Sequence, residues 1–215
     1  MKKFELTTNT KMFLGKKLFQ IKALISFGDV KAGELGGYIE KEENLSQTGD
    51  AWVFDNAWVS GDARVSGNAW VTDNARVTDN ARVFDNAWVS GDARVSGNAR
   101  VFDNAWVSGN ARVFDNAWVS DNARVSDNAR VSGDAWVSDN ACYTTIKGFG
   151  REYRTTTFFR CKDGKVRVQC GCFYGDLKEF RAIVKKTHGE SKKAKEYLMI
   201  ADLMELHFEE KENDK

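Results

Sequence analysis

Few residues in this sequence have side chains suited to catalysis. The two histidines, His188 and His207, both fall near the C-terminal end. The four cysteines are Cys142, Cys161, Cys170 and Cys172. A general base must come within hydrogen-bonding distance of the group it activates, and no local motif places either histidine for that role. The cysteines lack the Cys-x2-Cys spacing of structural zinc modules. We therefore expect no catalytic residue, no metal site and no cofactor.

Tryptophan and arginine are the residue types whose placement most suggests binding. All 7 tryptophans occupy one position of a six-residue repeat, [Gly/Asp]-[Asn/Asp]-Ala-[Trp/Arg]-Val-[Ser/Thr/Phe], and arginine fills that position in most other copies. Tryptophan offers a flat apolar face for stacking, and arginine offers paired hydrogen bonds to carboxylate or phosphate. Both are favoured at the centres of protein interfaces. This repeat position is therefore the candidate binding site.

The repeat itself predicts the element that positions these residues. Sixteen hexads run without insertion from Gly49 to Thr144, although the last, Asp139–Thr144, is degraded. Alanine and valine lie two residues apart, so in an extended strand both point to one side and the Trp or Arg between them points to the other. The Gly/Asp-Asn/Asp pair has turn chemistry. A fixed short period of this kind predicts a solenoid with alanine and valine inside.

The pattern of an aliphatic residue with a small residue two positions before it resembles the hexapeptide-repeat superfamily of left-handed parallel β-helices. That resemblance implies three hexads per triangular coil, and so a mainly β chain with a left-handed solenoid of about five coils. The left hand comes from the resemblance alone, because the spacing shows only a period of six.

Three hexads per coil arrange the outward residues in columns. The first face carries Trp52, Trp70, Trp88, Trp106 and Arg124. The second carries Trp58, Arg76, Arg94, Arg112 and Arg130, and the third carries Arg64, Arg82, Arg100, Trp118 and Trp136. We take the first face as the candidate binding surface. The secondary candidates are Arg76, Arg94, Arg112, Arg130, Trp118 and Trp136. Recent duplication of an 18-residue unit would also produce such columns, and ladders that only stabilise the stack are an open alternative.

The segments on either side of the repeat are expected to cap it, which divides the chain into 1–48, 49–144 and 145–215. Before the repeat we predict strands at Lys3–Thr8, Lys11–Leu14 and Lys17–Leu24, with turns at Asn9-Thr10 and Gly15. A two-residue bulge is expected near Gln47-Thr48, because Leu45 and Val53 are eight residues apart instead of six.

After the repeat the pattern predicts a small ββαα unit docked on the last coil. The strands Arg154–Lys162 and Lys165–Cys172 flank an Asp163-Gly164 turn. Asp176 with Glu179 predicts a helix start, Gly189 its end, and Ser191 the start of a second helix. The second helix has an apolar stripe made of Ala194, Tyr197, Leu198, Ala201, Met204 and Phe208.

Gly33–Ser46, the Asn-Ala-Arg-Val hexads and Cys170-Gly171-Cys172-Phe173 with the following helices together resemble an uncharacterised branch of that superfamily found chiefly in phages and prophages. The resemblance implies a phage-type protein in the cytoplasm of a bacterial host, but it implies no reaction. Acyltransferases of the superfamily use a histidine near the coil and a projecting loop. Neither is found in these hexads.

Charge and hydropathy exclude some partners. The repeat carries 8 basic and 13 acidic residues, and no segment is strongly basic, so nucleic acid is not an expected partner. The aspartates beside the arginines are expected to neutralise them. No apolar run has the length of a membrane span and no signal peptide is recognised, so the cytoplasm is expected, with no membrane partner.

We therefore expect a non-catalytic scaffold or protein-binding module that contacts another copy of the chain, as a dimer or trimer, or a host or phage protein. The alternative is a phage accessory factor that inhibits a host defence by gripping a defence protein or sequestering a nucleotide. An acyltransferase ranks below both.

Overall fold

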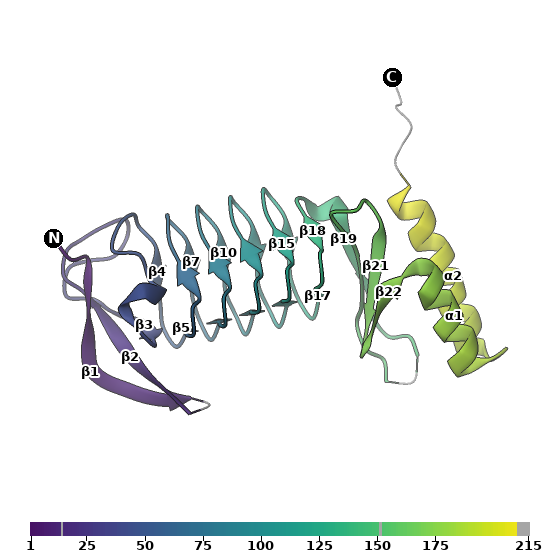
Figure 1. The fold of residues 1–215 in the computed structure, drawn as a ribbon, viewed down its shortest axis with the longest axis horizontal. Helices are drawn as coiled ribbons and strands as arrows, with labels where there is room; N and C mark the ends of the chain where they lie inside the picture. Colours follow the sequence, from purple (N-terminus) through teal and green to yellow (C-terminus); the bar gives the residue numbers. More distant parts are fainter. Residues whose placement is uncertain (14, 151, 210–215) are drawn as a thin grey trace, which may run out of the picture.

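The computed structural model describes residues 1–13, 15–150 and 152–209. Three parts follow one another along the long axis (Figure 1): an N-terminal hairpin, a prism of stacked short strands, and a C-terminal sheet with two helices. The prism is a parallel β-solenoid, as the repeat predicted, with about six turns where the hexads alone predicted about five.

Three parallel sheets form the walls of the prism, and every strand covers the Trp/Arg-Val pair of one hexad. The first wall contains β4 (Trp52–Val53), β7 (Trp70–Val71), β10 (Trp88–Val89), β13 (Trp106–Val107) and β16 (Arg124–Val125). The second contains β5 (Trp58–Val59), β8 (Arg76–Val77), β11 (Arg94–Val95), β14 (Arg112–Val113) and β17 (Arg130–Val131). The third contains β6 (Arg64–Val65), β9 (Arg82–Val83), β12 (Arg100–Val101), β15 (Trp118–Val119) and β18 (Trp136–Val137). The predicted columns are therefore confirmed, because each strand pairs in register with the one 18 residues away.

The interior of the prism is built from the alanine and valine of each hexad. From Ala51 to Val137 these side chains are at most 1% exposed. The corners bend because the first residue of each hexad before Asp139, Asp or Gly, adopts a positive φ, for example 62° at Asp73 and 67° at Gly91. Asparagine side chains join successive coils at two corners, as in the 3.0 Å bond from Asn68 Nδ2 to Asn86 Oδ1. The turn chemistry read from the sequence is confirmed.

The N-terminal part comprises β1 (Phe4–Phe13), β2 (Lys16–Ala23), β3 (Leu35–Ile39) and the 3-10 helix η1 (Glu42–Asn44). The predicted turn at Asn9-Thr10 is wrong. β1 continues through it, and the pairing with β2 only shifts register between Leu6 and Thr10, because a bulge accommodates these polar residues without reversing the chain. Gly15 does form the turn, with φ of 79°, and Leu14 lies outside the described residues.

The solenoid begins before the first hexad. Ile39 pairs with Val59 and Leu45 with Val65, each 20 residues away, so the two extra residues lie at the predicted bulge near Gln47-Thr48. The Gln47 side chain accepts hydrogen bonds from the Lys3 and Phe4 amides, which ties β1 to the bulge. Because Ile39 and Leu45 lie before the first hexad, the stack is longer than the hexads alone predict.

The end of the repeat also departs from expectation. The sixteenth hexad leaves the wall and forms the 3-10 helix η2 (Asn140–Cys142). Asp139 caps it by accepting from the Ala141 and Cys142 amides. The Asn140 side chain then accepts the Arg124 N–H, a bond that a further coil would have received through its backbone. This hexad therefore ends the stack instead of extending it.

The C-terminal part is larger than the predicted ββαα unit, because its sheet has four antiparallel strands. These are β19 (Tyr143–Ile146), β20 (Thr156–Arg160), β21 (Val166–Cys170) and β22 (Phe173–Asp176). β20 and β21 are the predicted hairpin around Asp163-Gly164. β19 and β22 are too short and too polar to show a period in sequence, and they form by pairing with that hairpin.

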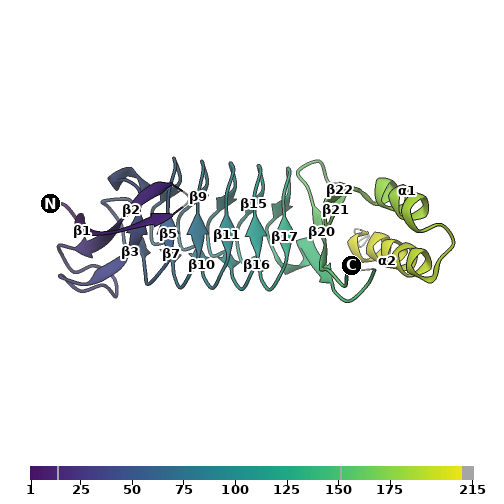
Figure 2. The same cartoon turned by 90° about the horizontal axis from the view of Figure 1, so that it is seen from below.

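Helices α1 (Leu177–His188) and α2 (Lys192–Phe208) cover the side of this sheet away from the prism (Figure 2). The predicted caps are confirmed: Asp176 and Glu179 form a capping box, and Ser191 caps α2. The predicted stripe on α2 is buried except for Leu198, which is only partly covered, and Ile200 joins it. The unit packs on the last coil, where the Thr157 hydroxyl accepts the Arg130 N–H at 2.9 Å.

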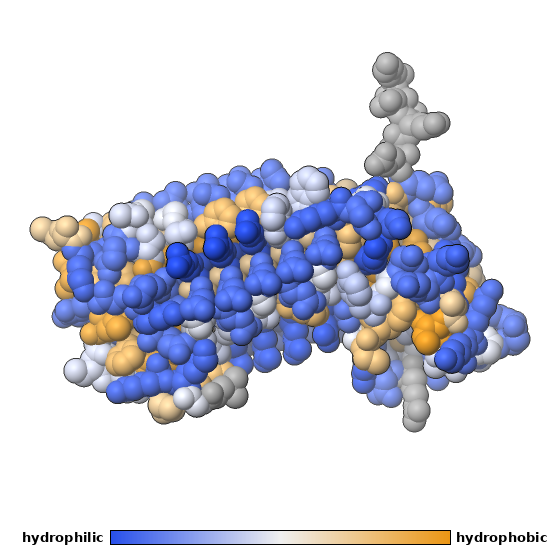
Figure 3. Space-filling model, in the orientation of Figure 1, coloured by the Kyte–Doolittle hydropathy of each residue, from blue (hydrophilic) through white to orange (hydrophobic). Residues whose placement is uncertain are grey.

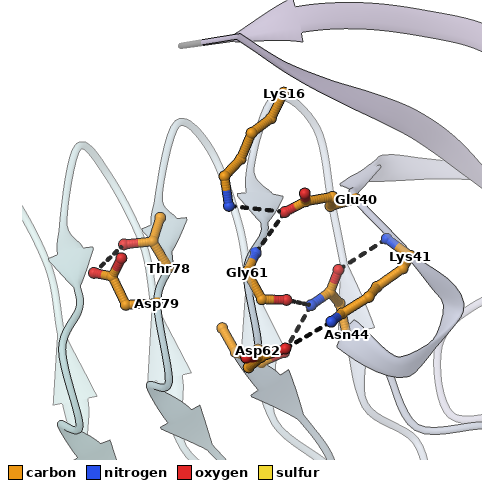
Figure 4. Close-up of polar contacts among 9 residues, drawn as sticks. Lys16, Glu40, Lys41, Asn44, Gly61, Asp62, Thr78 and Asp79 are labelled. Carbon is orange, nitrogen blue, oxygen red and sulfur yellow. Dashed lines mark hydrogen bonds and ion pairs between the residues drawn. The ribbon is translucent and has the colours of Figure 1, made fainter.

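The N-terminal end is closed by side chains in the same way (Figure 4). Glu40 accepts the Gly61 N–H at 2.6 Å and also pairs with Lys16. The bond from Gly61, with the help of Lys16, holds the pKa of Glu40 below its usual value. Asn44 donates from its amide nitrogen to the carbonyls of Gly61 and Ala63.

Candidate functional site

The first wall carries a continuous ladder of aromatic rings. The ring centroids of Trp70 and Trp88 are 5.5 Å apart and those of Trp88 and Trp106 are 5.0 Å apart. Phe54 lies against Trp70 at one end, and the Arg124 guanidinium lies 4.9 Å from the Trp106 ring at the other. We call Trp70, Trp88 and Trp106 the aromatic strip.

Trp52, expected to belong to this outward surface, is not available for binding. It is 0% exposed, because Phe4 and Phe27 from the N-terminal part pack edge-on against its ring at 6.2 and 5.3 Å. On the second wall Phe13 of β1 covers Trp58 in the same way. The sequence could not show this, since the covering residues lie far from the repeat in sequence and have no period.

Exposure increases along the aromatic strip away from the N-terminal part. Trp70 and Trp88 are partly buried by each other, whereas Trp106 is 42% exposed. Trp136 on the third wall is exposed to a similar degree, at 48%. Each ring covers part of its neighbour, so the strip presents ring edges and part of each face to solvent.

Four of the eight repeat arginines, Arg124 among them, lie over aromatic rings. Arg76 lies over Phe13 and Trp58, Arg100 over Trp118, and Arg130 over Phe114. Among the described residues, none of the eight repeat arginines forms an ion pair with a carboxylate. The expected neutralisation by neighbouring aspartates is therefore not made by direct ion pairs, and it stays a prediction.

The reason lies in where the corner aspartates point. Asp73 and Asp79 accept the backbone N–H of Gly91 and Gly97 in the next coil at 2.8 and 3.1 Å. A carboxylate used along the stack in this way is turned away from the arginine of its own hexad. The hexads of Arg94 and Arg112 begin with glycine instead, so these two arginines have no aspartate at the first position of their own hexads.

Two hollows lie along the arginine columns. A hollow of about 450 Å³ on the third wall is lined by Glu43, Ser46, Arg64, Val65, Ser66, Arg82, Phe84 and Arg100. Beside it the Phe84 and Phe102 rings stack in parallel at 5.0 Å, and Phe102 meets the edge of Trp118. Lys162 of the C-terminal part lies 3.6 Å above the Trp118 ring.

The larger hollow, about 960 Å³, lies between the second wall and the segment that leads into β20. Arg112 and Arg130 come from the wall, and Lys147, Tyr153 and Arg154 come from the segment. Sequence reasoning listed the two wall arginines but missed the other three. Only the general expectation that the C-terminal unit docks on the last coil pointed to a hollow here.

Both histidines contact aromatic rings, and Cys161 is the buried one of the four cysteines. The His188 ring stacks on Tyr197 and the His207 ring meets Phe208 edge-on, both in the C-terminal helices. Burial raises the pKa of the Cys161 thiol to about 11. Within residues 1–13, 15–150 and 152–209, no group of three or more His, Cys, Asp or Glu side chains is arranged to hold a metal ion.

Comparison with known families identifies the repeat. A family model described as the YdcK beta solenoid repeat matches residues 57–73, 75–91, 93–109, 105–121 and 123–139. The chain is a β-solenoid repeat protein. The matches to this β-solenoid start 18 residues apart within two runs, which agrees with three hexads per coil. No curated protein matches the chain. Among its described helices, none is both long and apolar enough to cross a membrane.

Proposed function

We propose that this β-solenoid is a non-catalytic binding module that contacts a protein surface, its own second copy or another chain, through the aromatic strip. The observation that supports the proposal is that tryptophans at the same repeat position differ in their exposure to solvent. Trp52 is covered by phenylalanines of the chain itself, as is Trp58 on the second wall, whereas Trp106 in the same column as Trp52 is 42% exposed.

The chemistry of the strip fits a protein interface. Stacked indole rings expose a contiguous apolar surface, and such surfaces on a soluble protein usually mark an interaction site. Arg124 flanks the strip, and Trp and Arg are enriched among the residues that dominate binding energy. On the face seen in Figure 3 the body of the prism is mostly hydrophilic, with a small hydrophobic patch along its upper middle and further hydrophobic residues toward its two ends.

A purely structural ladder is the competing explanation. Contacts between neighbouring rings stabilise the stack without any partner. The two explanations differ in one measurable respect, because a ladder acts only on the stability of the monomer and a binding strip also acts on assembly.

The test is the double variant Trp88→Arg, Trp106→Arg. Arginine already occupies this repeat position in eight hexads, so the fold should persist. We expect sedimentation velocity to show a dimer or trimer for the natural protein and mainly monomer for the variant. If the natural protein is monomeric, pull-down of a protein partner should be lost instead.

Trp136→Arg is the matched control, because it changes an exposed tryptophan at the same repeat position on another wall. It should leave assembly unchanged. Equal assembly and equal partner capture for all three proteins, with only melting temperatures altered, would show that the strip is a ladder. A phage origin and the inhibition of a host defence stay predictions from the sequence resemblance.

A further inference from the structure

The hollow between the second wall and the C-terminal part concentrates positive charge. Its lining includes four cations: Arg112, Arg130, Lys147 and Arg154. None of the four forms an ion pair with a carboxylate anywhere in the described part of the chain. Glu152 is the one carboxylate among the described lining residues. We call this surface the basic hollow.

The wall side of the basic hollow holds its cations at a fixed spacing. Arg112 and Arg130 pair in register on adjacent strands, so their backbones lie about 4.8 Å apart. Burial, together with the charges of Arg94 and Arg130, lowers the pKa of Arg112. Asn110 and Asn128, two residues before the two arginines, also line the hollow and add neutral amide groups; aspartate occupies this hexad position at Asp50, Asp62, Asp92 and Asp134.

Arg130 has unused hydrogen-bonding capacity in this place. Its side chain lies over the Phe114 ring, which fixes its direction, and its Nε atom is buried without a hydrogen-bond partner. The other donors of this guanidinium are on its two terminal nitrogens. The wall therefore offers oriented donors for an anion.

The backbone opposite the wall includes residues with positive φ. Tyr153 has a φ of 50°, and its side chain is 69% exposed. Gly171, with φ of 60°, leaves room for Arg154: a Cβ there would lie 3.3 Å from Arg154 Nη1. A non-glycine residue held at positive φ is often found where a side chain serves a ligand. Arg154 Nη1 thus lies close to the β21–β22 turn, and the exposed Tyr153 ring offers a face for stacking.

We propose that the basic hollow binds a nucleoside polyphosphate, with the phosphates on Arg112, Arg130, Lys147 and Arg154 and the base on Tyr153. Arginine forks suit phosphate oxygens, and their charge persists at every physiological pH. The volume of about 960 Å³ lies at the upper end of the range for small-molecule sites, which suits a nucleotide more than a single phosphate. This site is separate from the aromatic strip and does not depend on it.

The test is isothermal titration of the full chain with ATP, GTP, CTP and UTP, and with inorganic triphosphate as a probe without a base. We expect at least one nucleotide to bind, and to bind less tightly at higher salt. Arg112→Gln and Arg154→Gln should each weaken its binding at least tenfold. Tyr153→Ala should weaken the nucleotide but not triphosphate.

Arg82→Gln is the matched control, since it removes an arginine at the same repeat position on the third wall. It should bind the nucleotide as the natural protein does. The proposal is overturned if no nucleotide binds at millimolar concentration, or if Arg112→Gln and Arg154→Gln bind as tightly as the natural protein. Loss of binding in Arg82→Gln as well would also overturn it, because the attraction would then be general.

Discussion

Lys3 shows how single side chains close a stack whose two ends are chemically different. Each coil donates its backbone N–H groups to carbonyls of the coil that follows, as Trp52 does to Ala69. The first coil is therefore left with unpaired carbonyls and the last coil with unpaired N–H groups. Lys3 is only 2% exposed and donates to the carbonyls of Gly49 and Ala51. A side chain rich in donors and without an acceptor suits this carbonyl end.

Replacing Lys3 by methionine should reveal this role through its pH dependence. Burial lowers the pKa of Lys3 to about 8 from 10.5, opposed by the charge of Asp50. Between these values the unfolded chain binds the proton more strongly than the folded chain, so this lysine makes stability rise with pH there. Lys3→Met lacks the titration and leaves two carbonyls without their donor, at a cost of about 1–3 kcal/mol.

Chemical denaturation at pH 7.5 and 9.5 measures the effect. The free energy of unfolding of the natural protein should exceed that of Lys3→Met by more at the higher pH. Tyrosines and Cys161 titrate in both proteins and cancel in the comparison. A difference that shrinks as pH rises would contradict the assignment.

At the scale of the element, the hexad specifies its own strand and corner but not what lies against it. Position one is Asp or Gly because the corner needs a positive φ, which is readable in sequence. At Gly133 the fold imposes a second requirement, which the sequence of the hexad does not show. A Cβ on Gly133 would overlap the Tyr174 hydroxyl from β22, so this glycine also leaves room for the C-terminal sheet.

The substitution Gly133→Asp should therefore loosen the C-terminal part, although aspartate is native at this hexad position elsewhere. We expect destabilisation of about 1–3 kcal/mol from the steric conflict, and faster proteolysis after residue 140. Gly109→Asp is the matched control, because Asp103 and Asp121 already stack in adjacent coils. Equal melting and equal proteolysis of the two variants would show that Tyr174 does not constrain the corner.

The walls of the prism could be predicted from the sequence, whereas the contacts made at its two ends could not. The walls, columns, corners and both helices were predicted because their signals are local and periodic. The burial of Trp52, the strands β19 and β22 and the basic hollow were not, because each depends on contacts between segments far apart in the chain. The aromatic strip lies in the predicted column, but it is shorter than that column because Trp52 is buried.

On the scale of the whole molecule, the solenoid is close to one-dimensional, since each coil contacts only its neighbours. The N-terminal part satisfies carbonyls at one end, and η2 with the C-terminal sheet satisfies N–H groups at the other. Stability in such a protein is approximately a sum of coils and interfaces. Among the described residues, the ring contacts of the N-terminal part reach as far as Arg76 and those of the C-terminal part reach back to Trp118, so the number of coils between them is free to vary.

Deletion of residues 85–102 tests this modularity. It removes one complete coil and joins Phe84 to Asp103, the same residue pair that Phe102 and Asp103 form in the natural chain. Every column stays in register, with Trp70 brought against Trp106, so we expect a cooperative fold with a modestly lower melting temperature. Both ends and the basic hollow are untouched, so nucleotide binding there should be unchanged.

Deletion of residues 85–99 is the control that separates register from length. It removes fewer residues but joins Phe84 to Arg100, so Val83 and Val101 come to lie three positions apart and cannot both face the interior of a strand. This variant should lose its cooperative melting transition by circular dichroism. Similar melting of the two deletions would mean that the coils are not independent units, because stability would then follow chain length instead of the 18-residue period.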